Sequence, residues 1–192
     1  AKLIRKKLDA SNNDTTSLAE ELERLELYLV LEHMRFKDKF RYEVVVDAAV
    51  DTRAIELPAM MLQPYVENSI WHGILPMERP GTVTVRVGPG SPGHVRIEVL
   101  DDGIGVETSR ERKSGRPADH ISRGIEITKG RADVLRRLEL ADIRIQGPEQ
   151  LHDAEGRPTG TGVTIELPMA PPGTDGAADL RKPVDRLTFD QS

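Results

Sequence analysis

The sequence predicts an α/β fold, because helical and strand patterns alternate along one chain of 192 residues. A long helix is indicated by a capping box, Ser17 with Glu20, followed by leucines at three- and four-residue spacing. A β-hairpin is indicated by two alternating runs, 82–87 and 94–100, joined by GPGSPG. The length suits one domain with extensions and is sufficient to bury a core.

The composition excludes several classes of function. The chain has no cysteine, so it has neither a disulfide framework nor a thiolate metal site. No apolar run approaches the ~20 residues of a membrane-spanning helix and no leader pattern opens the chain, so we expect it to be soluble. The first residues, AKLIRKKLDA, form a basic amphipathic pattern, which we interpret as the last turns of a helix in a longer protein.

The helix that begins after Ser17 is expected to reach Phe36 or beyond. Its leucine stripe favours packing inside the domain over a dimer seam, because a coiled coil needs about three to four heptads. A strand is predicted next, over 41–50, from its β-branched residues. The stripe consists of Leu18, Leu22, Leu25 and Leu29.

A second helical stretch, 57–74, reads LPAMMLQPYVENSIWHGI. We expect it to start at Pro58 and to be kinked or split by Pro64, whose ring removes a donor and clashes with the preceding turn. The part over 65–71 should then behave as a short helix of its own. The face predicted to be buried consists of Met61, Leu62, Tyr65, Val66, Ser69, Ile70 and Gly73.

The other face of this stretch carries Glu67, Asn68 and His72. Their carboxylate, amide oxygen and imidazole share a small volume, which suits a hydrated hard cation and the phosphates that it carries. On this helix alone, an ordinary polar surface explains the pattern equally well.

A second motif, VLDDGIGV over 99–106, is an apolar strand that runs into an acidic pair and a Gly-x-Gly turn. A carboxylate fixed at a strand end, Asp101, can accept a hydrogen bond from an exocyclic amine. Gly103 and Gly105 permit close approach of a ligand. The alternative is a simple turn, because Asp-Gly is common in hairpins.

The later chain holds a polar segment, 106–122, without periodicity, which we interpret as a mobile loop that forms a lid. A short strand is predicted over 143–146. The stretch 156–168 is predicted to be a loop followed by the closing strand. Its TGTG sequence is, on its own, an ordinary flexible turn.

Together the motifs resemble those of the histidine-kinase ATPase domain, and QPYVENSIWHG resembles the asparagine box of LytS-type sensor kinases. VLDDGIGV resembles the first glycine box. SRGIEITKGRADVLRRL, 122–138, resembles the second glycine box, with Gly124 and Arg131 as matches. Gly160, Thr161 and Gly162 resemble the last glycine motif of that domain.

The resemblance implies a Bergerat-type two-layer α/β sandwich, with a mixed sheet covered on one face by about three helices and preceded by a helical linker. The implied domains are 1–38, the end of a dimerisation and phosphoacceptor region with the linker helix, and 39–170, the ATP-binding catalytic domain. The lid lies at about 106–122, and 171–192 forms a weakly ordered tail.

The implied function is that of a protein histidine kinase, which transfers the γ-phosphate of ATP to a histidine upstream of this chain. Asn68 would ligate Mg²⁺, and Glu67 with Asn68 would be catalytic. Asp101 would accept from the adenine amine beside Gly103 and Gly105. The further implied nucleotide contacts are His72, Arg123, Gly124, Lys129, Arg131, Thr161 and Gly162.

Two alternatives remain open. Relatives often carry lysine where this chain has Trp71 and glycine where it has Glu126, which favours a nucleotide-binding or dimerising regulatory module without transfer activity. A Bergerat-type ATPase that hydrolyses ATP is the other alternative. Its catalytic glutamate would stand where this chain has Pro64, which argues against hydrolysis.

The resemblance also implies partners and a location. It implies relay to a response regulator, of LytTR type or a similar DNA-binding class, a homodimer in the full-length protein, and a cytoplasmic domain that reaches the membrane only through upstream segments of an inner-membrane sensor. None of the five histidines lies in the family's acceptor motif. Residues 110–137 hold nine basic against four acidic residues but no aromatic side chain, so we expect no direct nucleic-acid binding.

Overall fold

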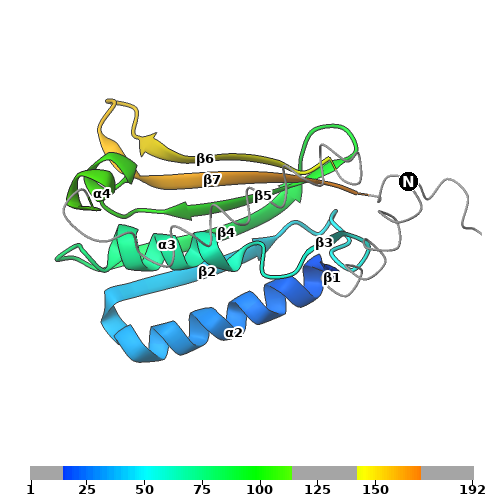
Figure 1. Cartoon of the computed structure of the whole chain (residues 1–192), viewed down its shortest axis with the longest axis horizontal. Coiled ribbons are helices and arrows are strands. Elements are labelled where there is room, and N and C mark those ends of the chain that lie inside the picture. The colour runs from blue at the N-terminus through cyan, green and yellow to red at the C-terminus, as the bar shows by residue number, and fades with distance from the viewer. Residues whose placement is uncertain (1–14, 114–141, 170–192) are drawn as a thin grey trace, which may run out of the picture.

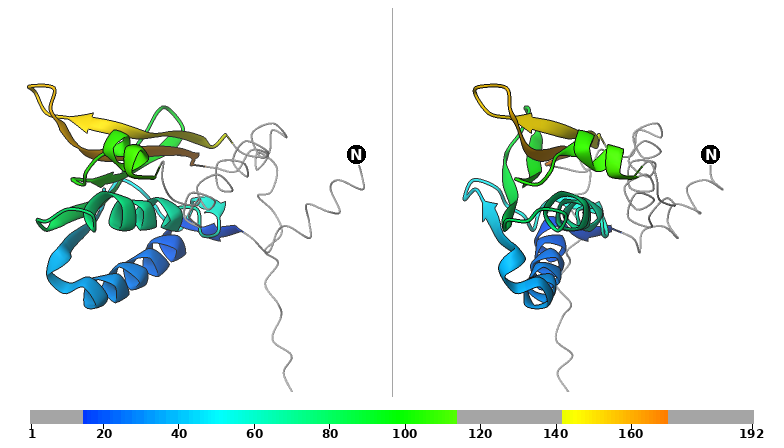
Figure 2. Two further views of the ribbon diagram at one scale, coloured as in Figure 1. Left: turned by 60° about the vertical axis from the view of Figure 1, so that its left-hand side comes forward. Right: turned by 90° about the vertical axis from the view of Figure 1, so that its left-hand side faces the viewer.

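The computed structural model describes residues 15–113 and 142–169. Within these ranges a five-stranded sheet has the order β2-β4-β5-β7-β6, and a small second sheet pairs β1 with β3. The helices lie on one face of the large sheet (Figures 1 and 2). The elements in chain order are β1 Thr15–Ser17, α2 Leu18–Phe36, the 3-10 helix η2 Lys37–Lys39, β2 Phe40–Val46, β3 Glu56–Pro58, α3 Gln63–Asn68, the π-helix η3 Ser69–Ile74, β4 Gly81–Pro89, β5 His94–Asp101, α4 Val106–Lys113, β6 Arg144–His152 and β7 Pro158–Pro168.

The sheet is mixed, as predicted. Strands β2 and β4 are parallel, and the pairs β4–β5, β5–β7 and β6–β7 are antiparallel. Strand β5 therefore lies at the centre, between β4 and β7. The two-layer arrangement and the antiparallel hairpin β4–β5 are confirmed. No helix within the described ranges is long and apolar enough to cross a membrane.

Helix α2 begins and ends where the sequence predicts. The Ser17 hydroxyl accepts the Glu20 N–H at 3.2 Å, and the Glu20 carboxylate accepts the Ser17 N–H at 3.1 Å, which completes the capping box. The predicted leucine stripe is buried in the domain core and is not a dimer seam. Its members are Leu18, Leu22, Leu25 and Leu29.

The strand predicted over 41–50 ends earlier, at Val46. The Asp47 carboxylate accepts the Ala49 N–H at 2.8 Å, and the Asp47 carbonyl accepts the Val50 N–H at 3.0 Å. These local bonds turn the chain, because an aspartate side chain competes with the strand ladder for backbone donors.

The second helical stretch does not start at Pro58, and Pro64 does not kink it. Residues 56–58 pair with β1 instead. Helix α3 begins at Gln63, which places Pro64 in the first turn, where a missing N–H costs no helical hydrogen bond. The continuation is a π-helix, Ser69–Ile74, whose wider turn is closed by the Leu75 N–H on the Ile70 carbonyl at 2.9 Å.

Two segments predicted as loops are regular. The first part of 106–122 is helix α4, whose residues are all polar apart from Val106 and so show no apolar periodicity; residues 114–122 lie outside the described ranges. Strand β7 starts at Pro158, so TGTG lies inside a strand, and the short strand predicted over 143–146 extends to His152. Pairing between strands has overridden local turn preference here. The predicted helix at 1–10 and the tail at 171–192 also lie outside the described ranges.

The start of α3 is fixed by a buried carboxylate of α2. Glu21 is 3% exposed and accepts the backbone N–H groups of Met60 and Leu62, both at 3.0 Å. Met60 has a φ of 58°, a left-handed conformation that costs a non-glycine residue roughly 1–2 kcal/mol. Arg24 lies 3.3 Å from the Glu21 carboxylate and balances its charge. Glu21 therefore holds this loop in a conformation that its own residues disfavour.

We predict that Glu21→Ala lowers the free energy of unfolding by about 2–4 kcal/mol, because two inward-facing amides lose their acceptor at about 1–3 kcal/mol each. Urea unfolding followed by circular dichroism measures the change. The matched control is Glu23→Ala, an exposed glutamate of the same helix, with an expected effect within about 0.5 kcal/mol. Equal losses in the two variants would contradict the role assigned to Glu21.

Candidate functional site

The site is centred on Asp101, the last residue of the central strand. Its carboxylate is 4% exposed, and Oδ1 accepts the Gly103 N–H at 2.9 Å. Burial raises the pKa of Asp101 to about 6, and the Ser69 hydroxyl and the Gly103 and Thr161 amides oppose this rise in pKa; the Asp102 charge adds slightly to it. Within the described ranges, Oδ2 is buried and has no hydrogen-bond partner of good geometry. Asp101 Oδ2 is therefore an acceptor at the strand end that could take a further hydrogen bond.

Two glycines bring the π-helix η3 against this carboxylate. A Cβ on Gly73 would lie 2.8 Å from Asp101 Oδ1, and a Cβ on Gly103 would lie 2.5 Å from the Gly73 Cα. The Ile104 N–H donates to the Gly73 carbonyl at 2.9 Å. Any side chain at either position would push the helix away from the strand end, because both neighbours are backbone or buried atoms.

The TGTG element also packs against the strand end. Gly160 has a φ of 147°, and a Cβ there would lie 1.8 Å from the Asp101 carbonyl oxygen. Thr161 pairs with Asp101 in the sheet and is buried beside it. Gly162 pairs with Leu100, so it belongs to the opposite face of the sheet. The structure therefore brings Thr161 to Asp101 but does not bring Gly162 there.

The acidic pair divides into two roles. The Asp102 carboxylate accepts the Thr82 N–H at 2.6 Å and pairs with Arg79 at 3.2 Å. The Arg79 guanidinium also donates to the Asp102 carbonyl at 2.8 Å. Asp102 therefore ties the strand end to β4, and Asp101 alone presents an uncommitted acceptor.

Gly105 begins the segment that leads into α4. Its φ of 82° is left-handed, and a Cβ there would lie 2.2 Å from the Gln150 side chain of β6. Gln150 in turn donates to the Gly160 carbonyl at 2.8 Å. The two glycine motifs are thus joined through Gln150, a contact that the sequence did not indicate.

The helical part of the site shows the predicted two faces. Glu67, Asn68 and His72 are half-buried on the polar face. Gln63 donates to the Glu67 carboxylate at 2.7 Å, whereas Asn68 makes no side-chain hydrogen bond to the described part of the chain. The predicted apolar face is buried in full; its members are Met61, Leu62, Tyr65, Val66, Ser69, Ile70 and Gly73.

The described residues alone do not form a complete metal site. Within the described ranges, no three acidic or histidine side chains are grouped to hold an ion. One amide oxygen from Asn68 and one carboxylate from Glu67 nevertheless fit Mg²⁺, which usually keeps several waters and binds through one or two protein oxygens plus phosphates. Arg123, Gly124, Glu126, Lys129 and Arg131 lie outside the described ranges.

Ser69 is the residue of the site that the sequence analysis missed. It lies on the buried face of η3, 5% exposed, and its hydroxyl lowers the pKa of the nearby Asp101 carboxyl. The signal was present, because a serine among apolar residues, one turn from Gly73, requires a buried polar partner.

Relatives in the curated proteins share most of the chain. It is 24% identical over 168 residues to the sensor protein LytS of Staphylococcus haemolyticus, covering 88% of this chain and 27% of that protein. It is 27% identical over 165 residues to the sensor histidine kinase/phosphatase LytS of Staphylococcus aureus Mu50, covering 86% and 27%. It is 31% identical over 107 residues to the sensor histidine kinase YpdA of Escherichia coli K12, covering 56% and 18%. No family model matches the chain.

Solved structures share the fold. The chain superposes on full-length ShkA in complex with AMPPNP with a TM-score of 0.53 and 16% identity, covering 82% of this chain and 31% of that one. It superposes on the nucleotide-free catalytic domain of the histidine kinase ThkA with a TM-score of 0.50 and 18% identity, covering 82% and 99%. The fold is therefore that of a histidine-kinase catalytic domain. Over 86–88% of its length the chain is homologous to LytS sensor histidine kinases, and it spans about a quarter of their length.

We predict that Asp101→Asn stabilises the ligand-free protein above about pH 6. The folded state holds the Asp101 proton with a pKa of about 6, against 3.8 for an ordinary aspartate, so it binds that proton more tightly than the unfolded state does. Stability must therefore fall as the pH rises from about 4 to about 6, by up to about 3 kcal/mol.

Urea unfolding of both proteins at about pH 5, 6 and 7.5 measures this dependence. The advantage of Asp101→Asn over the natural sequence should widen as the pH rises through this window. A difference between the two proteins that stays constant with pH would show that the buried charge is not its cause.

Proposed function

We propose that the chain binds ATP with Mg²⁺ and transfers the γ-phosphate to a histidine of a separate helical element. The observation that carries this proposal is the buried Asp101 Oδ2 acceptor at the end of the central strand, in a setting walled by Gly73, Gly103 and Gly160. A polar ligand with an amine donor would satisfy that acceptor, and the absence of side chains lets a flat base approach it.

In this proposal Asp101 accepts a hydrogen bond from the exocyclic amine of adenine. Gly103 and Gly105 leave the approach to the base lined only by backbone. Thr161, which pairs with Asp101 in the sheet, favours the ionised carboxylate through its backbone N–H. At neutral pH a carboxyl with a pKa of about 6 is mainly ionised, so it acts as an acceptor and not as a donor.

The phosphates would lie toward the polar face of α3. Asn68 offers an amide oxygen to Mg²⁺, and Glu67 is placed to hold a water of the metal or to polarise the attacking group. His72 is a further candidate for phosphate contact, together with Arg123, Gly124, Lys129 and Arg131. Phosphoryl transfer requires mainly positioning and neutralisation of charge, which this set of residues can supply without an internal nucleophile.

The wider context is also a proposal. The relatives are named sensor kinases, which supports relay of the phosphate to a response regulator, of LytTR type or similar, by a homodimeric membrane sensor. We assign 39–170 to the catalytic domain and 1–38 to the linker region. Because α2 buries its leucines in the core, the linker helix folds together with the catalytic domain.

One observation favours the second candidate, a nucleotide-binding module without transfer. The Trp71 side chain packs against α2, with the Phe36 ring centroid at 5.4 Å, so the helix that carries Asn68 presents no cation at this position. Incubation with γ-labelled ATP, Mg²⁺ and a separately supplied acceptor domain distinguishes the two candidates. Acid-labile phosphate on the acceptor supports the kinase, and ATP binding without transfer supports the module.

We predict that Asp101→Asn weakens ATP binding roughly tenfold or more while the fold stays intact, because a hydrogen bond to a charged group is worth about 1.5–3 kcal/mol. Isothermal titration with ATP measures the affinity. GTP, which presents a carbonyl where adenine has its amine, serves as the matched ligand; it should bind poorly to the natural protein and lose no affinity in Asp101→Asn, whose amide can donate to that carbonyl. Unchanged ATP affinity in a folded variant would remove the basis for the adenine site.

We predict that Asn68→Ala removes mainly the Mg²⁺-dependent part of the ATP affinity, because it deletes a metal ligand and no base contact. Titration with ATP in the presence of Mg²⁺ and of excess chelator separates the two parts. Glu23→Ala, which changes an exposed residue of α2 outside the site, is the control. Equal losses with and without metal would count against Asn68 as a ligand.

A further inference from the structure

The π-helix η3 contacts Asp101 through Gly73 and helix α2 through Trp71. π-helices are rare and occur frequently at functional sites, where the wider turn re-aims side chains. Here Ser69 and Gly73 are four residues apart and share the side that faces Asp101. Trp71, two residues from each, belongs to the other side of the turn.

Trp71 meets α2 through two contacts. Its ring is edge-to-face with Phe36, at 5.4 Å and 88°, and the Arg35 guanidinium lies over it at 5.1 Å. Aromatic pairs and cation–π contacts of this kind have preferred geometries, so they fix the orientation of the ring as well as its burial.

Helix α2 therefore holds the α3–η3 segment at both ends. At the beginning, the Glu21 carboxylate binds the amides of Met60 and Leu62. At the end, Trp71 packs against the last turns of α2. Between these two anchors the segment has little freedom to rotate, and its inner side is pressed against Asp101 without space for a methyl group.

We propose that Trp71 is a positioning residue: its packing against α2 fixes the π-helical turn, and with it Ser69 and Gly73, in the geometry in which Asp101 receives the base. This inference rests on the adenine site proposed above. A core residue that only fills space would affect stability alone. A positioning residue must also change the environment of the Asp101 carboxylate, which lies on the other side of the π-helical turn.

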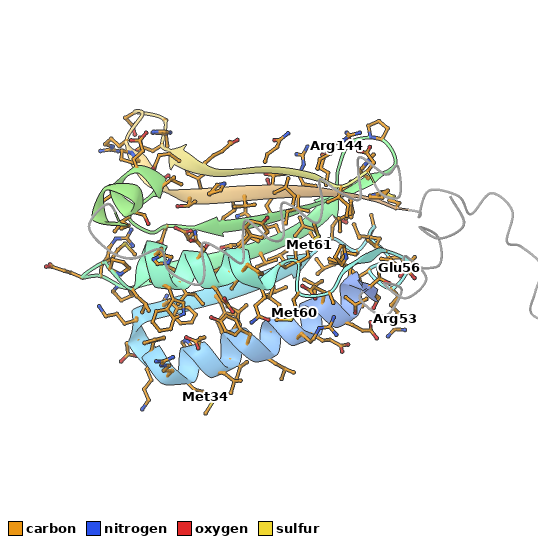
Figure 3. The ribbon with its side chains drawn as sticks, viewed as in Figure 1. Met34, Arg53, Glu56, Met60, Met61 and Arg144 are labelled. Atoms are coloured by element: carbon orange, nitrogen blue, oxygen red, sulfur yellow. The ribbon has the colours of Figure 1, made fainter. Side chains whose placement is uncertain are left out.

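The first test needs no nucleotide. The carboxyl ¹³C signal of Asp101 is titrated by NMR in the full chain and in Trp71→Ala, Trp71→Phe and Met34→Ala, with the neighbouring Asp102 carboxyl followed in the same spectra. Met34 is the matched control, since it is an exposed side chain near the end of α2 that points away from the sheet (Figure 3).

In Trp71→Ala the pKa of Asp101 should fall by roughly one unit toward its ordinary value, because a displaced turn admits water to the carboxylate. Trp71→Phe keeps a ring against Phe36 and Arg35 and should retain the original pKa, as should Met34→Ala. If Trp71→Ala does not fold, Phe36→Ala removes the same edge-to-face contact from the α2 side and is expected to produce the same shift.

The second test uses adenosine, which carries the base without phosphates. Trp71→Ala should bind adenosine at least about tenfold more weakly, a change of about 1.4 kcal/mol, and Trp71→Phe should bind it nearly as well as the natural sequence. Failure of the natural protein to bind adenosine would refute the adenine site, while the carboxyl titration would still decide the role of Trp71. An unshifted Asp101 titration in folded Trp71→Ala, or an equal shift in Met34→Ala, would overturn the inference.

Discussion

The structure depends on one close contact, between the backbone of the π-helix η3 and the end of the central strand. Gly73 and Gly103 leave no space for a Cβ on either side, and the Ile104 N–H closes the contact on the Gly73 carbonyl. Helix and sheet can approach this closely only where both lack side chains. Everything that surrounds Asp101 follows from this approach, since the carboxylate is buried by backbone instead of by bulky neighbours.

A contact that tight must be held from both directions. On the sheet side, Asp102 binds Thr82 and Arg79 and keeps the strand end in register with β4. On the helix side, α2 holds the segment through Glu21 and Trp71. Glu21 of α2 and Asp102 at the strand end lie far apart in the sequence, so these supports come together only after the tertiary fold has formed. Helix α2 therefore packs as part of the same folded unit that contains Asp101.

Local signals in the sequence predicted the parts of the fold that local chemistry determines. The capping box at Ser17 and the hairpin β4–β5 are confirmed because their determinants are adjacent in the chain. The errors occurred where distant partners decide. Pro64 was predicted to break a helix, but residues 56–58 pair with β1 and the helix begins only at Gln63. Gly160 was predicted to lie in a turn, but it lies in strand β7, which pairs with β5. For the site, Asp101 was predicted from its strand-end position, whereas the effect of the Ser69 hydroxyl on the Asp101 pKa depends on the π-helical turn, which has no distinct sequence pattern.

The unpaired acceptor at Asp101 explains how such a site can be selective for its ligand. Burying a carboxylate without a full set of donors lowers the stability of the ligand-free fold, and the rise of its pKa to about 6 expresses that conflict. A ligand with an amine donor would lower the free-energy cost of the buried carboxylate by pairing with it. A ligand with a carbonyl at the same place would raise that cost, because two acceptors would face each other. Discrimination then arises from the cost of a mismatched buried group, which exceeds the gain from one matched bond. If Asp101 binds the base as proposed, the energetic cost of its buried charge is the physical source of specificity.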